Sequence, residues 1–154
     1  MNILDVIGVA VDTCSPAIKA RHQRLTLNLP PAPLNMSGDN LRLAQIVSNL
    51  LDNASKYTPE GGRITLTTEA EGNDIAIVVA DNGTGIAPDA LSHIFELFVQ
   101  DERALALQSG GLGIGLAVVR DLVEAHCGTV VARSAGAGRG SEFVVRLPMR
   151  RPNS

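Results

Sequence analysis

Residues 49–57 read Asn-Leu-Leu-Asp-Asn-Ala-Ser-Lys-Tyr, and this is the first of four short, informative stretches in the chain. The later stretches are Asp-Asn-Gly-Thr-Gly at 81–85, Phe-Glu-Leu-Phe at 95–98 and Gly-Leu-Gly-Ile-Gly-Leu at 111–116. Glycines also make ordinary turns, and helical asparagines are usually just solvated, so none of the stretches is decisive alone. Their order and spacing are informative in combination.

The first stretch falls on a helix predicted from Asp39 to Tyr57, which a Ser-Gly-Asp cap opens and a Pro-Glu-Gly-Gly run ends. Because each residue turns a helix by about 100°, Asn49, Asn53, Lys56 and Tyr57 form one polar stripe. An apolar stripe beside it must face a sheet and comprises Leu43, Val47, Leu50, Leu51 and Ala54. The polar groups suit phosphate oxygens and a hydrated Mg²⁺, although a solvated helix flank is the alternative.

The second stretch places Asp81 at the end of an apolar strand, before a turn that Gly83 and Gly85 allow to approach a ligand closely. A fixed carboxylate there can accept a hydrogen bond from an exocyclic amino group. The alternative is an Asx-type turn in which Asp81 only caps its own loop.

The glycine-rich stretch at 111–115 runs straight into a helix, so free backbone N–H groups and the positive end of the helix dipole can receive a phosphate. It lacks the preceding strand of a dinucleotide-binding fingerprint, and the chain has no Gly-Lys-Ser/Thr phosphate loop. A flexible hinge is the alternative. The four stretches together indicate a domain that holds a nucleoside triphosphate.

The rest of the chain predicts one α/β (α+β) domain over residues 1–149, with a short tail at 150–154. We expect helices at 3–21 (broken or restarted at Pro16), 39–57, 88–95 and 112–126, strands at 24–29, 63–69, 74–81, 129–133 and 141–147, and an irregular loop at 99–111. The apolar run within 74–81 predicts a strand that is buried on both faces. The sum is a two-layer sandwich, a mixed, largely antiparallel sheet of about five strands with helices on one face.

The composition limits the class of ligand and the cellular compartment that we expect. A net charge of −3 with no Trp and one Tyr excludes a general attraction to nucleic acid, so a small anionic ligand is favoured. Cys14 and Cys127 have no pairing or metal-ligand spacing and are expected to be buried in a reduced compartment. Since no apolar run reaches the length of a membrane span, we expect a cytoplasmic domain without direct membrane contact, and a membrane anchor elsewhere in a parent protein stays open.

With all four stretches in this order, the chain resembles the ATP-binding catalytic domain of sensor histidine kinases. These belong to the superfamily that also holds DNA gyrase, Hsp90 and the MutL proteins, with its Bergerat-type ATP-binding fold. The resemblance runs from about Ile3 to Leu147 and includes the Gly-Arg-Gly-Ser-Glu-Phe turn at 138–143. It implies ATP and Mg²⁺ as cofactors.

The resemblance also implies roles for single residues. Asn53 is the Mg²⁺ ligand, with Gln108 as a further candidate, and Asn49 and Lys56 serve the metal and phosphates as the catalytic pair. Asp81 takes the adenine amino group. The remaining implied ATP-binding residues are Tyr57, Gly83, Gly85, Ile86, Phe98, Gly111, Leu112, Gly113, Gly115, Leu116 and Ser141. Phe95 and Phe98 would anchor a lid formed by residues 99–110.

One position separates kinases from ATPases in this superfamily. The gyrase, Hsp90 and MutL enzymes carry a Glu where this chain has Asn49, and an amide cannot accept a proton at neutral pH. The domain should therefore activate water poorly and need a base from elsewhere. A gyrase, Hsp90 or MutL type of ATPase and a catalytically inactive nucleotide-binding interaction module remain the alternatives.

The phosphoacceptor implied by the resemblance is a histidine on a separate helical dimerisation domain. His22, His93 and His126 lack the acidic residue and proline that follow that histidine in the family, and we interpret them as surface or helix-end residues. The expected function is transfer of the ATP γ-phosphoryl group to that partner in two-component signalling, with a response regulator receiver domain as an indirect partner. The isolated domain is expected to be monomeric.

Overall fold

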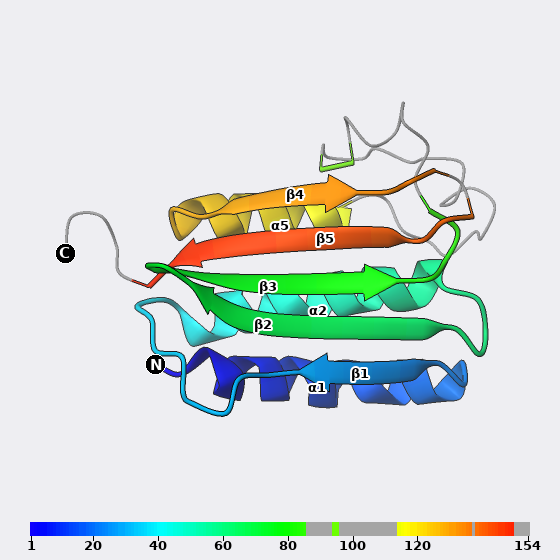
Figure 1. The fold of residues 1–154 in the computed structure, drawn as a ribbon, viewed down its shortest axis with the longest axis horizontal. Coiled ribbons are helices and arrows are strands. Elements are labelled where there is room, and N and C mark those ends of the chain that lie inside the picture. Colours follow the sequence, from blue (N-terminus) through cyan, green and yellow to red (C-terminus); the bar gives the residue numbers. More distant parts are fainter. Residues whose placement is uncertain (86–93, 96–113, 137, 150–154) are drawn as a thin grey trace.

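The computed structural model describes residues 1–85, 94–95, 114–136 and 138–149. Within these ranges the helices α1 (Ile3–Ala20), α2 (Asn40–Tyr57) and α5 (Ile114–Ala125) cover one face of a five-stranded sheet (Figure 1). The strands are β1 (Arg24–Asn28), β2 (Arg63–Glu71), β3 (Asp74–Asp81), β4 (Thr129–Arg133) and β5 (Ser141–Pro148). The predicted two-layer sandwich is confirmed.

The sheet has the strand order β1-β2-β3-β5-β4. β1 pairs with β2 in parallel, and the other neighbours are antiparallel. A parallel pair needs a crossover connection, which α2 supplies between β1 and β2. β2 and β3 form a hairpin around Gly72 and Asn73, where Gly72 has a φ of 61°.

Alternation along the strands decides which side chains enter the core. The inward positions of β3 and β5 are at most 1% exposed: Ile75, Ile77, Val79, Phe143, Val145 and Leu147. On the opposite face of β3, Ala76 is buried but Val78 is half-buried, so burial on both faces is only partly confirmed. Asp81 continues the inward series at the end of β3, which directs its side chain to the helical side of the sheet.

The predicted break at Pro16 is wrong, because α1 runs through this residue without interruption. Proline removes the hydrogen bond to the carbonyl of residue i−4, here Asp12. Both residues are exposed, so water can serve that carbonyl. The buried Cys14 and Ile18 hold the helix to the core on either side of the proline.

The two cysteines differ in their surroundings. Cys14 is buried on α1, as predicted, whereas Cys127 is exposed just after α5 with a φ of 62°, so its predicted burial is wrong. Both thiols are free. None of the described helices is long and apolar enough to cross a bilayer.

The predicted helix at 88–95 and the irregular loop at 99–111 lie outside the described residues except for Ile94 and Phe95. Ile94 is buried, and the Phe95 ring meets the Phe143 ring edge to face, with centroids 6.0 Å apart. The start of the 95–98 stretch therefore packs on the same side of the sheet as the helices.

Candidate functional site

Three elements that carry predicted site residues meet at one end of the molecule. The carboxyl end of β3, the last turn of α2 and the first turn of α5 all lie at the right-hand end of the sheet in Figure 1. This end gathers the last turn of α2, the 81–85 loop and the start of α5, which are far apart in the sequence. The topology therefore assembles the described part of the predicted site.

The Asp81 carboxylate is held by two donors. Asp81 and Ser141 are register partners on β3 and β5, and Ser141 Oγ donates to Asp81 Oδ2 over 2.7 Å. The Gly83 amide donates to Asp81 Oδ1 over 2.8 Å, which is the Asx-type turn considered from the sequence. Because each carboxylate oxygen can accept a second hydrogen bond, the turn and a ligand contact are compatible.

The loop at 81–85 is fastened to the end of α2. The Thr84 amide donates to the Tyr57 carbonyl over 3.1 Å. Gly83 lies so close that a Cβ there would be 2.2 Å from the Tyr57 oxygen and 2.8 Å from Asp81 Oδ1. Only a residue without a side chain fits between the Asp81 carboxylate and α2.

The other side of the loop is fastened to the connection between β4 and β5. The Gly138 amide donates to the Thr84 carbonyl over 2.6 Å, and the Gly140 amide donates to the Gly83 carbonyl over 3.1 Å. Gly85 has a φ of 74°, and a Cβ there would be 2.1 Å from the Gly136 oxygen. The backbone around Asp81 is therefore fixed from both sides.

The polar stripe on α2 lies at the edge of the buried face, as predicted. Asn49, Asn53 and Lys56 are half-buried, and Tyr57 is 9% exposed. Asn53 Nδ2 is buried and has no hydrogen-bond partner among the residues that the structure describes. A buried amide group without a protein partner is unusual and fits a side chain that meets a ligand or an ordered water.

Lys56 pairs with Asp52 one helical turn earlier, with 3.1 Å between Nζ and Oδ2. The two side chains are 38% and 53% exposed, and such surface pairs contribute only about 0.3–0.5 kcal/mol. The ammonium group can therefore leave Asp52 for a stronger anion such as a phosphate. The position of Lys56 is compatible with its predicted role.

Some of the other predicted residues belong to the described part of the chain and the rest do not. Ser141 and Leu116 are buried, at 5% and 7% exposure, and Gly115 lies with Leu116 in the first turn of α5. The remaining predicted residues lie outside the described residues: Ile86, Phe98, Gln108, Gly111, Leu112 and Gly113. The predicted lid at 99–110 lies outside them as well.

A hollow of about 470 Å³ has Asp81 and Ser141 among its lining residues. Its lining comes from β3, β4, β5 and the loop between β4 and β5, and includes Arg133 and Arg139. Ala80, Arg133 and Glu142 belong to the sheet face opposite the helices. The hollow is therefore separate from the α2 stripe, and we do not place the predicted nucleotide in it.

Two polar residues that the sequence did not single out lie near the site. The Thr84 hydroxyl is buried without a partner among the described residues, and the Thr84 amide donates to the Tyr57 carbonyl. Gln23 is buried and bonds to the end of α2. The polar residue between two glycines was a signal for Thr84, whereas Gln23 has no local pattern to mark it.

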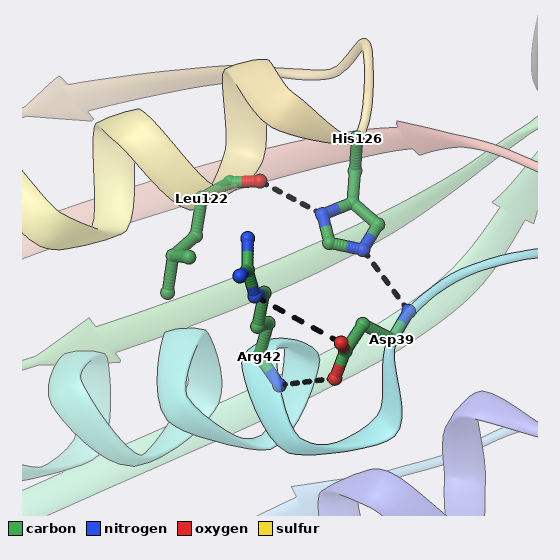
Figure 2. Close-up of polar contacts among 4 residues, drawn as sticks. All are labelled: Asp39, Arg42, Leu122 and His126. Atoms are coloured by element: carbon green, nitrogen blue, oxygen red, sulfur yellow. Dashed lines mark hydrogen bonds and ion pairs between the residues drawn. The ribbon is translucent and has the colours of Figure 1, made fainter.

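His126 was expected at a surface or a helix end. It follows α5 directly, so the helix-end position is confirmed, and the side chain is only 4% exposed. Its Nδ1 donates to the Leu122 carbonyl over 2.8 Å and its Nε2 accepts from the Asp39 amide over 3.2 Å (Figure 2). The imidazole therefore ties the end of α5 to the N-cap of α2.

Comparison with known proteins agrees with this geometry. TcrY of Mycobacterium tuberculosis, named a probable sensor histidine kinase, is 37% identical over 95% of this chain and 30% of its own length. Full-length ShkA in complex with AMPPNP matches 96% of this chain and 30% of that chain, at 33% identity and a TM-score of 0.81. The mycobacterial sensor histidine kinase MprB matches 97% and 96%, at 26% identity and a TM-score of 0.82.

The chain thus spans about a third of the length of the curated relatives that it matches. The family described as histidine kinase-, DNA gyrase B- and HSP90-like ATPase matches residues 38–151. That range contains α2, the 81–85 loop, α5 and Ser141, which form the described part of the site. The chain belongs to this ATPase family, and within it to the catalytic domains of sensor histidine kinases.

Proposed function

We propose that this chain binds Mg-ATP at the end of its sheet and donates the γ-phosphoryl group to a histidine on a separate helical domain of the same kinase. The observation that carries the proposal is the Asp81 carboxylate, fixed between Ser141 and Gly83 beside the polar end of α2. ShkA, a relative at 33% identity, has a full-length structure in complex with AMPPNP. This analogy supports a nucleotide triphosphate as the ligand.

The adenine end of the nucleotide belongs to the 81–85 loop in this proposal. Asp81 accepts a hydrogen bond from the exocyclic amino group, and Ser141 orients the carboxylate. Gly83 keeps the space beside Asp81 free of a side chain, since a Cβ there would be 2.8 Å from Oδ1. Tyr57 borders the base, and Ile86 and Leu116 contribute apolar contacts. A flat base with one amino group matches this set of groups.

The phosphate end belongs to α2 and the start of α5. Asn53 holds Mg²⁺ through its amide oxygen, which is a suitable ligand for this hard cation. Its buried amide nitrogen, which has no partner among the described residues, is then left to donate to a phosphate oxygen. Asn49 and Lys56 contact the metal and phosphates. The backbone N–H groups of Gly111, Leu112, Gly113 and Gly115 receive phosphate oxygens, while Gln108 is a further metal ligand and residues 99–110, anchored by Phe98, form the lid.

Bound Mg²⁺ neutralises charge on the phosphate oxygens during transfer. The chain itself positions the nucleotide, because the amide of Asn49 cannot take a proton from water as a glutamate at that position could. The attacking imidazole must come from the partner domain together with its own base. We therefore propose a phosphotransferase that hydrolyses ATP slowly on its own.

Location and partners follow from the same proposal. The 1–149 domain works in the cytoplasm as part of a longer kinase, beside a helical dimerisation and phosphoacceptor domain, and a response regulator receiver domain takes the phosphoryl group afterwards. Neither nucleic acid nor a membrane contacts the domain, and the isolated chain is monomeric. These properties rest on the family and on the charge of the chain.

Calorimetry with Mg-ATP tests the binding site. Asp81→Ala removes a charged acceptor worth about 1.5–3 kcal/mol, so the affinity should fall by about tenfold or more. Asp74→Ala is the matched control, because Asp74 lies at the opposite end of β3, about 23 Å away at the usual rise per residue. Equal affinities for the Asp81→Ala and wild-type chains would remove Asp81 from the adenine pocket.

The metal and the reaction need separate tests. Asn53→Ala should weaken the Mg²⁺ dependence of ATP binding, whereas Asn40→Ala on the exposed start of α2 should not. Mixing the chain with Mg-ATP and the helical domain of the same kinase should produce acid-labile phosphate on that domain. Rapid release of phosphate from ATP without phosphoprotein would instead identify an ATPase.

A further inference from the structure

Gln23 is a buried side chain whose hydrogen-bonding capacity is taken up by α2. It is 8% exposed and lies between α1 and β1. Its Nε2 donates to the Ser55 carbonyl over 2.9 Å and to the Thr58 carbonyl over 2.7 Å. Its Oε1 accepts from Ser55 Oγ over 2.7 Å. Both amide hydrogens and the amide oxygen therefore bind the same turn.

These bonds complete the C-terminus of α2. The last four carbonyls of a helix have no partner within the helix and must find one elsewhere. Thr58 is the C-cap of α2 and has extended backbone angles, so α2 ends without a glycine in the left-handed conformation. Gln23 supplies donors from outside the helix, and Arg21 Nη2 adds one to the Thr58 carbonyl over 3.2 Å.

The turn that Gln23 holds is also the support of the Asp81 loop. Tyr57 stands between the two carbonyls that bind Gln23, and its own carbonyl accepts the Thr84 amide. Gly83 rests directly against the same carbonyl. A displacement of the last turn of α2 would therefore be passed to the loop whose backbone positions the Asp81 carboxylate.

We propose that Gln23 is a positioning residue of the nucleotide site: it fixes the last turn of α2, and through the Tyr57 carbonyl it fixes the 81–85 loop. The inference rests on the proposed function of that site. Gln23 does not touch the nucleotide in this scheme. It sets the separation between the Asp81 loop, which holds the adenine end of the ligand, and the stripe with Asn53 and Lys56, which holds the phosphate end.

The test compares two variants that both lose buried contacts of the α1–β1 region. Gln23→Met keeps the length of the side chain but removes the donors and the acceptor. Ile7→Ala is the matched control, because Ile7 is fully buried on α1 about 20 Å from its C-terminal end at 1.5 Å per residue. Calorimetry with Mg-AMPPNP gives the affinity, and thermal unfolding gives the loss of stability.

Gln23→Met should raise the Kd for Mg-AMPPNP by about tenfold, while Ile7→Ala should leave it within about twofold at a comparable loss in Tm. Equal effects of the two variants on Kd, or an unchanged Kd in Gln23→Met, would overturn the proposal and leave Gln23 a purely structural residue. If Gln23→Met does not fold, Ser55→Ala removes one of the three bonds. It should raise Kd by a smaller factor, and no change would overturn the proposal equally.

Amide hydrogen exchange separates this inference from the proposed function. The Thr84 amide should exchange about tenfold faster in Gln23→Met than in the wild-type chain, without nucleotide, and at the wild-type rate in Ile7→Ala. A wild-type chain that does not bind Mg-AMPPNP would refute the proposed function, whereas unchanged Thr84 exchange in Gln23→Met would refute the coupling through Tyr57 by itself.

Discussion

Replacing Gly83 with alanine tests whether the Asp81 loop is seated on α2 as described. A Cβ at this position would lie 2.2 Å from the Tyr57 oxygen and 2.9 Å from the Tyr57 carbonyl carbon. These are backbone atoms that cannot rotate away. Since carbon and oxygen approach to about 3.3 Å, the loop and α2 must separate by about 1 Å.

The magnitude follows from the bonds that this separation breaks. The Thr84 amide loses the Tyr57 carbonyl, which is worth about 1 kcal/mol, and the charge-assisted bond from the Gly83 amide to Asp81 is worth about 1.5–3 kcal/mol. Gly83→Ala should therefore destabilise the chain by about 2–4 kcal/mol. For a domain of this size the Tm should fall by roughly 5–15 °C.

Denaturant unfolding of three chains provides the assay. Gly8→Ala is the control, because Gly8 lies in α1 and no atom of the described residues is within 4 Å of the added Cβ. Alanine there should be neutral or stabilise by up to about 1 kcal/mol. Gly83 has a φ outside the left-handed region, so only the contacts exclude a side chain. If Gly83→Ala unfolds within about 0.5 kcal/mol of the wild-type chain, the contact with Tyr57 is wrong.

Two further predictions concern residues outside the nucleotide site. His126→Ala leaves the Asp39 amide without its acceptor and should lower the unfolding free energy by about 1–3 kcal/mol. His22→Ala is the control, because its side chain is 75% exposed, and it should change the unfolding free energy by less than about 0.5 kcal/mol. Comparable losses in the two variants would contradict the hydrogen bond between His126 and Asp39. Burial, with a smaller contribution from Asp52, raises the pKa of the Cys14 thiol above its ordinary value of 9.0. The resulting contribution to folding stability is fully present below pH 9.0 and is lost as the pH rises toward the higher pKa of the folded state. Stability measured from about pH 8 to about pH 10 should fall less steeply in Cys14→Ala, and parallel curves would refute this.

Local sequence patterns predicted the elements because their causes are local. The Asp39 side chain caps α2 by accepting from the Arg42 amide, three residues away, as the Ser-Gly-Asp sequence indicated. The inward residues of β3 follow the alternation of the sequence. Pro16 was misjudged because a local rule for proline ignores the solvent on that side of α1.

Contacts between distant residues could not be predicted in the same way. His126 hydrogen-bonds to Asp39, which is 87 residues away in the sequence, and Gln23 hydrogen-bonds to Ser55, which is 32 residues away. Neither residue differs in its local pattern from a solvated side chain, so only the assembled sheet and helices show their burial. For the site, the resemblance supplied the roles of Asp81 and Asn53, which stay predictions, and the structure supplies the surroundings that make those roles testable.

The outer strands of the sheet limit what else can join it. β1 and β4 are the edges, and each has only five residues. Two residues after β1 the chain reaches Pro30 and Pro31, which have no amide hydrogen to offer a neighbouring strand. Two copies of the domain would gain few hydrogen bonds by pairing their edge strands, so we do not expect this kind of pairing to cause aggregation at high protein concentration.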